Sequence, residues 1–506
     1  MTVTELCERS KIARKFVDDD LLWQETLQSA YVKEIAIARC TAWSDPLIRI
    51  SFLEQLIKCN GKMLFSEINR KGEEIKFPHM IKIPKEEPGE YRICKVEPND
   101  GRIIFAFLNN CLFDLNKDMV HHSCRSYQKG MGTQGSVEEV SREICKMPHN
   151  KCGAKIDYHA YFDTVLKECV FKIFDIIEER DGQWEQGTNP FINLMRTCYD
   201  NDFIYDLDKN LICEWSGIRQ GNPISAFLAD VVLYDVDEFM SKKYPYYIRY
   251  SDDSIILTDS PEEAIADIKR LTEKYGVVLN DKKTEIIYKN RFVKFLGFSI
   301  LSQNITISRR RLGDFEKQIL DLTINLYRTV SCKEIKPGKW QMRDRLTGKS
   351  YGKVYTDKKE CLETFRKWWY KQSIEKVMNF LYGDPNSDME FSWSTSILPT
   401  INVQSDLIEM NKFVQDCLRA VITGKYKING LGYEANKIHN GEKRLSVVTY
   451  SPASGGGGGK NVKANMEKQK KLPIWLPLMC MQKLIKMSKF LFISANKNAR
   501  MDLLIY

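Results

Sequence analysis

Hydrophobic positions recur with a helical period through the first part of the chain. The segments 20–37 and 47–58 place apolar side chains three to four positions apart, with charged residues on the face between them. That period is typical of amphipathic helices. We therefore expect an N-terminal helical extension over residues 1–80.

The pattern becomes extended from Ile81 to Leu108. Here β-favouring runs are separated by turn signals at 87–89 (Glu-Pro-Gly) and 98–101 (Pro-Asn-Asp-Gly), and this arrangement is typical of hairpins. We expect a hairpin whose strands carry the basic side chains Arg92, Lys95 and Arg102.

Short apolar runs alternate with longer amphipathic stretches between Ala154 and Ile300, which favours an α+β or α/β unit. After Asn304 the helical period returns, at 309–327, 360–381 and 403–422, with basic residues on the polar faces. A helical domain is expected to follow the mixed one.

A Ser/Gly run at 451–459 and the lysine-rich stretch up to Lys471 come late in the chain. Their composition is typical of a mobile connector. A short hydrophobic tail, 472–506, follows it.

Composition narrows the class of protein. The 506 residues, 43% hydrophobic and 28% charged, are typical of a globular chain with several domains, and the net charge of +9 suits a polyanionic partner. The 15 cysteines show no paired C-x-x-C spacing, so neither a zinc site nor a disulfide framework is expected. Because there is no signal peptide and no apolar run of about 18 residues, we expect a cytoplasmic protein without a membrane partner.

Candidate chemistry begins with Tyr250-Ser251-Asp252-Asp253, which stands between two β-rich runs. The two acids are therefore expected at the tip of a hairpin. Adjacent carboxylates repel one another, and a hard divalent cation such as Mg²⁺ would relieve that repulsion. Ordinary turn chemistry is the alternative.

A third acid, Asp157, ends a short apolar strand, and Tyr161 and Phe162 follow it. Two metal ions about 4 Å apart can activate a 3′-hydroxyl and stabilise the leaving pyrophosphate, but they need carboxylates from two strands held side by side. Asp157 and Asp252 are the candidates. The alternative for Asp157 is a helix N-cap.

Two loops add candidates. The segment 217–225 reads GIRQGNPIS and precedes an apolar helical stretch, 226–240; its glycines allow backbone to approach a base pair closely. A glycine-rich turn capped by Ser225 is the alternative. Lys283 follows the second loop's Leu279-Asn280 and is placed to protonate or neutralise pyrophosphate, with a solvated surface lysine as the alternative.

Taken in order, these pieces resemble reverse transcriptases of the bacterial, group II intron-like and retron-like kind. The resemblance runs from about Ile81 to Leu322. It includes Asp157 with Phe162, Gln220-Gly221, Tyr250 to Asp253, Lys283 and Phe295-Leu296-Gly297.

The resemblance implies an α+β right-hand polymerase with fingers, a palm built on an antiparallel sheet plus helices, and a helical thumb. The expected divisions are an N-terminal helical extension 1–80, fingers 81–153, palm 154–303, thumb and C-terminal region 304–450, a Gly/Lys linker 451–471 and a tail 472–506.

The resemblance also implies roles for single residues. Asp157, Asp252 and Asp253 would bind two Mg²⁺ ions, with Mn²⁺ as a substitute, and Lys283 would assist catalysis. Phe162 matches the family's sugar gate, which would clash with a ribose 2′-hydroxyl and favour dNTPs; core packing is the alternative.

Further residues are implied to bind substrate. Arg92 and Arg102 match the basic residues of the fingers that hold the triphosphate, with solvated hairpin charges as the alternative. Gln220, Gly221 and Tyr250 would line the same site.

Two positions depart from the family pattern. Arg219 stands where the family usually has Pro, and we expect it to alter the template path or add a phosphate contact. Ser251 stands where Ala or Met is usual, and it is small enough to leave the nucleotide site open.

In the thumb, the cluster Trp368-Trp369-Tyr370 is expected in the core rather than as a base-stacking platform. Basic side chains on the first thumb helix are expected along the duplex backbone, with solvated helix faces as the alternative: Arg309, Arg310, Arg311 and Lys317.

Among reverse transcriptases the chain resembles the unknown-group and abortive-infection enzymes of bacterial antiphage defence. The resemblance implies an RNA template, such as an associated non-coding RNA, a DNA product and dNTP substrates, with a companion protein or a homo-oligomer as further partners. The alternatives are the reverse transcriptase of a diversity-generating retroelement and a catalytically silent nucleic-acid-binding scaffold.

Overall fold

The computed structural model divides the chain into two compact units, residues 1–136 with 143–291, and residues 137–142 with those from 292 onward. The described residues are 1–29, 37–68, 74–84, 91–128, 132–214, 217–326, 330–345, 347–382 and 397–423, with short pieces at 32, 35, 72, 427–428 and 447–448. The predicted linker, 451–471, and tail, 472–506, lie outside the described residues.

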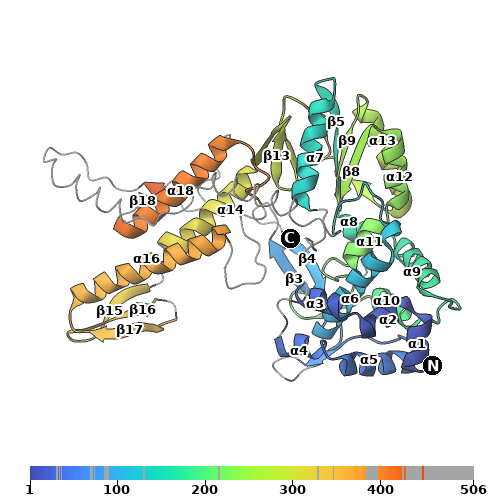
Figure 1. Ribbon diagram of the computed structural model, residues 1–506, viewed down its shortest axis with the longest axis horizontal. Helices are drawn as coiled ribbons and strands as arrows, with labels where there is room; N and C mark the ends of the chain where they lie inside the picture. The colour runs from blue at the N-terminus through green and yellow to red at the C-terminus, as the bar shows by residue number, and fades with distance from the viewer. Residues whose placement is uncertain are drawn as a thin grey trace, which may run out of the picture. The chain divides into compact units, whose positions relative to one another are not determined.

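Helices make up most of the described residues from Val3 to Lys58, as the hydrophobic period predicts (Figure 1). The rest of the expected helical extension, up to residue 80, contains short strands instead. The first residues of the helices explain where they begin, because Thr2 forms a capping box with Glu5 and Asp45 caps the helix that has Pro46 at its first position. The helix expected over 20–37 ends at Leu27. The bounds are α1 Val3–Arg9, α2 Lys11–Asp18, α3 Asp20–Leu27, α4 Ile37–Ala42 and α5 Pro46–Lys58.

These N-terminal helices share one core with the rest of the first unit. The ring of Phe16 lies 5.1 Å from that of Phe107, and Trp23 stacks on Phe107 at 4.4 Å. Phe107 belongs to α6 (Asn99–Leu115), a helix whose residues 103–108 are all buried.

The prediction of an extended strand up to Leu108 is therefore wrong, and Arg102 lies on α6. An apolar run that is buried on all sides carries no period, so its sequence does not separate a strand from a core helix. The residues interpreted as a turn, Pro98 to Gly101, instead start this helix, with Pro98 at the N-cap.

The expected hairpin survives in its first part, as β3 (His79–Pro84) and β4 (Tyr91–Val96). It extends into a four-stranded sheet of order β4-β3-β6-β7, in which β3 and β6 (Phe203–Tyr205) run parallel and β7 is Leu211–Cys213. Further elements of the first unit are β1 Glu67–Ile68, β2 Glu74–Ile75, α8 Tyr161–Thr164, α9 Lys167–Asp181 and α10 Pro190–Asp200. Helix α7 (Thr133–Lys146) is divided, because its residues 137–142 belong to the second unit.

A five-stranded antiparallel sheet forms the centre of the mixed region. Its middle strand is β5 (Lys151–His159), with β9 (Asp253–Leu257) and then β8 (Tyr246–Tyr250) on one side. On the other side β5 pairs with β10 (Val278–Leu279) and β11 (Glu285–Tyr288). The predicted hairpin that ends in Asp252 and Asp253 is confirmed as β8 and β9.

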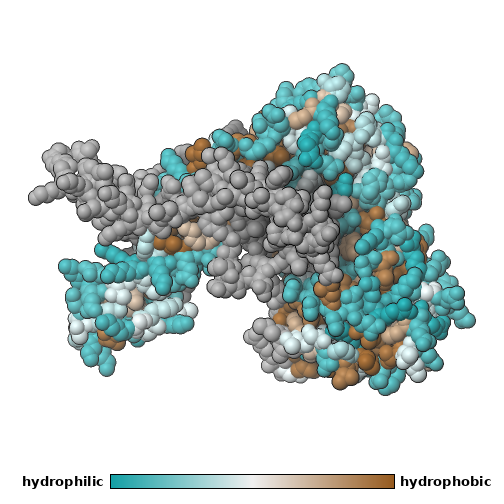
Figure 2. All heavy atoms as spheres, viewed as in Figure 1, coloured by the Kyte–Doolittle hydropathy of each residue, from teal (hydrophilic) through white to brown (hydrophobic). Residues whose placement is uncertain are grey.

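Helices α12 (Tyr234–Lys243) and α13 (Pro261–Thr272) pack against this sheet, and their outer surface is mainly hydrophilic (Figures 1 and 2). The single helix expected over 226–240 is divided into α11 (Ser225–Val231) and α12, with the break at Val232 and Leu233.

The region 304–450, most of the second unit, was predicted to be helical, but it also contains a sheet. Alternating residues around the turns at Gly338 and Gly348 form the sheet β15 (Val330–Lys336), β16 (Lys339–Asp344) and β17 (Ser350–Tyr355). The other elements are β12 Val293–Phe295, β13 Phe298–Leu301, β14 Asn304–Ile307, α14 Arg309–Leu320 with a π-helical end to Asn325, α16 Lys358–Tyr382, α18 Gln404–Thr423, β18 Lys427–Ile428 and β19 Val447–Val448.

The cluster 368–370 lies in the core of the second unit, as predicted. Trp369 is fully buried and donates its indole N–H to the carbonyl of Thr323 at 2.8 Å. Among the described residues, no helix is both long and apolar enough to span a bilayer.

We predict that Gly153→Ala destabilises the fold by about 2 kcal/mol or more, because a methyl group there would lie 2.2 Å from the carbonyl oxygen of Ile256 on β9. Chemical denaturation measures the loss. Gly135→Ala is the matched control: nothing lies within 4 Å of its added carbon in α7, so stability should be unchanged or slightly higher. Equal stability of the two variants would contradict the close packing of β5 on β9.

Candidate active site

The pairing of β5 with β9 brings the three candidate acids together. In the antiparallel register Asp157 stands directly opposite Asp253, and the backbone N–H of Tyr158 donates to the carbonyl of Asp252 at 3.1 Å. Asp252 occupies the turn between β8 and β9. The N-cap alternative for Asp157 is excluded, since α8 begins at Tyr161 without a side-chain cap.

Asp157 and Asp253 each have a basic or amide partner. The Asp157 carboxylate accepts from Asn280 Nδ2 at 3.0 Å and lies 3.5 Å from Lys283 Nζ, whereas Asp253 Oδ1 lies 3.5 Å from Lys155 Nζ. Lys283 is mostly exposed, and Lys155 is nearly buried.

Burial and mutual repulsion destabilise the charged forms of the turn acids. Burial raises the pKa of Asp252, the negative charge of Asp157 raises it further, and Arg92 and Lys283 oppose the shift. Burial raises the pKa of Asp253 to about 6, with Lys155 lowering it and both other acids raising it. The three carboxylates are therefore close enough for the charge of one to shift the pKa of another.

Such a site suits a hard divalent cation. In the described part of the chain, no three His, Cys, Asp or Glu side chains by themselves enclose a metal position. Mg²⁺ does not require a full protein cage, because it binds through one or two carboxylates and completes its shell with water and substrate phosphates. Asp157, on β5, and Asp252, in the turn that leads into the neighbouring strand β9, fit that requirement.

The structure separates the two arginines that the resemblance assigned to the triphosphate. Arg92, exposed on β4, acts electrostatically on Asp252. The charge of Arg102 acts instead on His79 and Cys40. Arg102 thus acts on His79 and Cys40, and its role in holding the triphosphate stays a prediction.

The glycine loop, which contains Gly217, Gln220 and Gly221, packs against β4 and Val165. The N–H of Lys95 on β4 donates to the carbonyl of Gln220 at 2.6 Å, and a methyl group on Gly221, whose φ is +108°, would lie 2.8 Å from Lys95 O. At Gly217 the added carbon would collide with the carbonyl of Val165. Backbone packing therefore requires both glycines. The approach of this loop to a base pair stays a prediction.

Phe162 and Tyr250 lie close to the acids in the chain and are both half-buried. Phe162 packs against the core, and its carbonyl accepts from the N–H of Ile218 at 2.7 Å, which ties α8 to the glycine loop. Tyr250 closes β8 and pairs in register with Asp253.

The expected phosphate contact of Arg219 is wrong, whereas its effect on the template path stays a prediction. Its side chain is 5% exposed and donates to the carbonyl of Asn201, while its guanidinium lies 3.8 Å from Glu97. Burial raises the pKa of Glu97, and Arg219 is the main opposing influence. Arg219 therefore stabilises a buried carboxylate.

Sequence reasoning missed Lys155 and Asn280 as members of the site. A signal was available for Lys155, because residues two apart on a strand share a face and Lys155 precedes Asp157 by two. Asn280 had no such signal, because its contact depends on how β10 pairs with β5.

Residues 83–300 match the family model of the reverse transcriptase (RNA-dependent DNA polymerase). The chain contains a reverse transcriptase domain. The expected α+β fold with an antiparallel palm sheet is confirmed by this match together with the topology. A search of curated proteins found no match.

Solved structures that resemble part of the chain include two telomerases and a viral RNA polymerase. Telomerase from Candida tropicalis, truncated from its C-terminal domain, is 15% identical over 52% of this chain, with a TM-score of 0.32. Telomerase from Candida albicans with a fragment of telomeric RNA is 12% identical over 74% of this chain and 68% of its own, with a TM-score of 0.34. The RNA-dependent RNA polymerase of a human picorbirnavirus is 9% identical over 50% of this chain and 53% of its own, with a TM-score of 0.35. The chain spans 60% of the Candida tropicalis structure.

We predict that Arg219→Met lowers the free energy of unfolding by about 3 kcal/mol, since Glu97 would be left buried without its cation. Urea denaturation measures the change. The double variant Glu97→Gln/Arg219→Met removes both charges and should recover part of the loss. A single variant as stable as the parent protein would contradict the buried pairing.

Proposed function

We propose that the chain is an RNA-directed DNA polymerase that joins dNTPs to a 3′-hydroxyl. One observation carries the proposal: within the reverse transcriptase domain, Asp157 lies opposite Asp253 across β5 and β9, with Asp252 in the adjoining turn. Two neighbouring strands thereby bring carboxylates together at one end of the sheet, as metal-assisted phosphoryl transfer requires.

In this proposal Asp157 and Asp252 are the principal ligands for two Mg²⁺ ions, for which Mn²⁺ can substitute. Bound there, the ions would lower the pKa of the 3′-hydroxyl and stabilise charge on the leaving pyrophosphate. Asp253, which faces Lys155, supports the turn and is the third candidate ligand.

The surrounding cations complete the site. Lys283 lies beside Asp157, and the exposed guanidinium of Arg92 acts on Asp252, so both are placed where a triphosphate would approach the acids. Arg92 would bind phosphate oxygens in a bidentate manner, and Lys283 would neutralise pyrophosphate.

Phe162 is proposed as the sugar gate. It stands five residues after Asp157 at the start of α8, and its ring packs edge to face on Tyr161 at 5.5 Å. A ring held in this way resists displacement, so it would exclude a ribose 2′-hydroxyl by steric clash.

The proposed partners are an RNA template, a DNA product and dNTPs. The role in antiphage defence with an associated non-coding RNA, and the alternative of a diversity-generating retroelement, rest on the sequence resemblance alone and stay predictions.

We expect Asp252→Asn to lower primer extension by about 10³-fold or more, because it removes a charged metal ligand. The assay supplies an RNA template, a DNA primer, Mg²⁺ and labelled dNTPs. Chelation with EDTA should stop extension by the unmodified protein, and Asp208→Asn, at an exposed turn position, should extend normally.

Extension by Asp252→Asn at the normal rate would refute the assignment of the acids. Tight RNA binding by the unmodified protein without any extension would favour the silent scaffold instead.

We expect Phe162→Val to increase incorporation of NTPs relative to dNTPs by about 10- to 100-fold, since the smaller side chain leaves room for the 2′-hydroxyl. The ratio of kcat/KM for UTP and dTTP on one template measures it. Phe171→Val on α9, which also packs against the core, is the control. An unchanged ratio would mean that Phe162 serves packing alone.

A further inference from the structure

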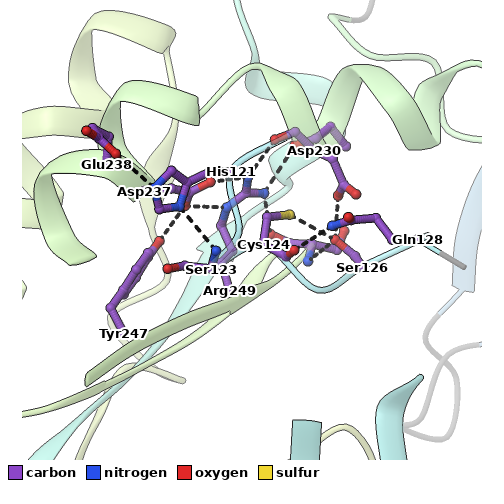
Figure 3. Close-up of polar contacts among 12 residues, drawn as sticks. His121, Ser123, Cys124, Ser126, Gln128, Asp230, Asp237, Glu238, Tyr247 and Arg249 are labelled. Atoms are coloured by element: carbon purple, nitrogen blue, oxygen red, sulfur yellow. Dashed lines mark hydrogen bonds and ion pairs between the residues drawn. The ribbon is translucent and has the colours of Figure 1, made fainter. Parts of the chain in front are cut away.

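One buried arginine fastens the strand that leads into the catalytic turn. Arg249, fully buried on β8, donates from Nε and Nη2 to both carboxylate oxygens of Asp237 on α12, at 2.8 and 2.6 Å (Figure 3). The remaining N–H groups donate to backbone carbonyls: Nη1 to Ala229 at 3.1 Å and Ser251 at 3.4 Å, and Nη2 to Asp230 at 2.8 Å. All five donors of the guanidinium are therefore used.

This arrangement explains why the predicted single helix is divided. Ala229 and Asp230 lie in the last turn of α11, where carbonyl groups lack helical partners. The cation of Arg249 satisfies two of these carbonyls. It thereby joins the end of α11, the side chain of Asp237 on α12 and the carbonyl of Ser251 in the turn.

The segment 123–125 pairs with the outer edge of β8. The N–H of Arg249 donates to Ser123 O at 2.9 Å, and the carbonyl of Arg249 accepts from the N–H of Arg125 at 2.8 Å, in a parallel bridge. This backbone pairing carries the next residue, Ser126, to the tip of the β8–β9 turn. Ser126 belongs neither to the hairpin predicted from the sequence nor to any of the sequence motifs.

The hydroxyl of Ser126 connects the turn to α11. It accepts from the N–H of Ser251 at 2.9 Å. It also donates to the carboxylate of Asp230 (Figure 3). Ser126 and Asp230 are both fully buried. Because a serine hydroxyl has only one proton, its donation to Asp230 directs its lone pairs toward the N–H of Ser251.

The backbone at Ser251 needs such a restraint. Its φ is +56°, in the left-handed region that side chains other than glycine rarely adopt. Asp252 follows directly, so the direction of its carboxylate depends on this conformation. Loss of the bond would also leave a buried N–H without a partner, which favours a different turn.

From this geometry we infer that Ser126 is a positioning residue, whose hydroxyl, oriented by Asp230, holds the turn at Ser251 in the conformation that faces Asp252 toward Asp157. The inference rests on the proposed function, because it assigns Ser126 a role in the metal site of the polymerase. In this role Ser126 acts through Ser251 and Asp252, and not as a metal ligand.

The carboxyl of Asp230 is buried at an energetic cost. Burial raises its pKa to about 7, with Arg249 as the main opposing charge. An apolar side chain at this position would avoid this desolvation. The hydrogen bond to Ser126 gives the buried acid a specific use.

The test is Ser126→Ala, with Mn²⁺ binding by electron paramagnetic resonance as a readout that needs neither substrate nor turnover. We expect the affinity for Mn²⁺ to fall about tenfold and kcat for primer extension to fall by at least as much, with KM for dNTP within about twofold of normal. Thr26→Ala is the matched control, since it removes an equally buried hydroxyl that bonds to Leu22 O on α3, and it should change neither quantity.

Two further variants separate positioning from stability. Asp230→Leu keeps a side chain that branches at Cγ but removes the acceptor of Ser126, so Mn²⁺ affinity should again fall even if Ser126→Ala does not fold. Ser251→Gly favours the left-handed conformation by itself, so adding Ser126→Ala to it should cost less than adding Ser126→Ala to the parent protein. A merely structural role of Ser126 predicts no such coupling.

Normal Mn²⁺ affinity in folded Ser126→Ala or Asp230→Leu would overturn the inference. Failure of the proposed function is distinguishable, because the unmodified protein would then not extend a primer while the Mn²⁺ measurement could still be made. Equal losses from Ser126→Ala in the parent protein and in the Ser251→Gly variant would also overturn it.

Discussion

The register between β5 and β9 is the constraint on which the rest of the site depends. It places Asp157 opposite Asp253 and Ile156 opposite Ser254. Because side chains alternate between the two faces of a sheet, a slip of one residue would turn every side chain of β5 to the other face. Gly153 helps to fix the register, since its missing side chain admits the backbone of β9.

Holding the acids together is electrostatically unfavourable, and the surrounding structure offsets this in two ways. First, basic and amide side chains lie beside two of the acids: Lys155 beside Asp253, and Asn280 and Lys283 beside Asp157. Behind the turn, the buried pair of Arg249 and Asp237 uses hydrogen bonds rather than apolar contacts to join β8, α11 and α12. Such a network specifies one arrangement, because each alternative would leave a buried polar group unpaired.

The sequence predicted the parts whose signals are local. Asp157 at the end of an apolar strand and Asp252 at the tip of a hairpin were both expected, because β-favouring runs and turn residues are read from neighbouring positions. The helix α6 was missed because a run buried on all sides has no amphipathic period. The sheet β15–β17 was missed where its short strands were taken together with the helices around them.

Long-range contacts explain the remaining differences. Arg219 looks like a solvent-facing cation in a glycine loop, and only the folded chain brings it to Glu97. Likewise, nothing near Ser126 in the sequence indicates that β8 would carry it to Ser251. Side chains that act through distant partners have no periodic signature, so their roles follow from the fold alone.

The most direct test of the account is a crystal structure of the protein with Mn²⁺, a primed template and a non-reactive dNTP, read by anomalous scattering. We expect manganese coordinated by carboxylate oxygens of both Asp157 and Asp252, with the triphosphate on the same ions. Manganese bound elsewhere, with Asp157 and Asp252 turned away from each other, would contradict the account.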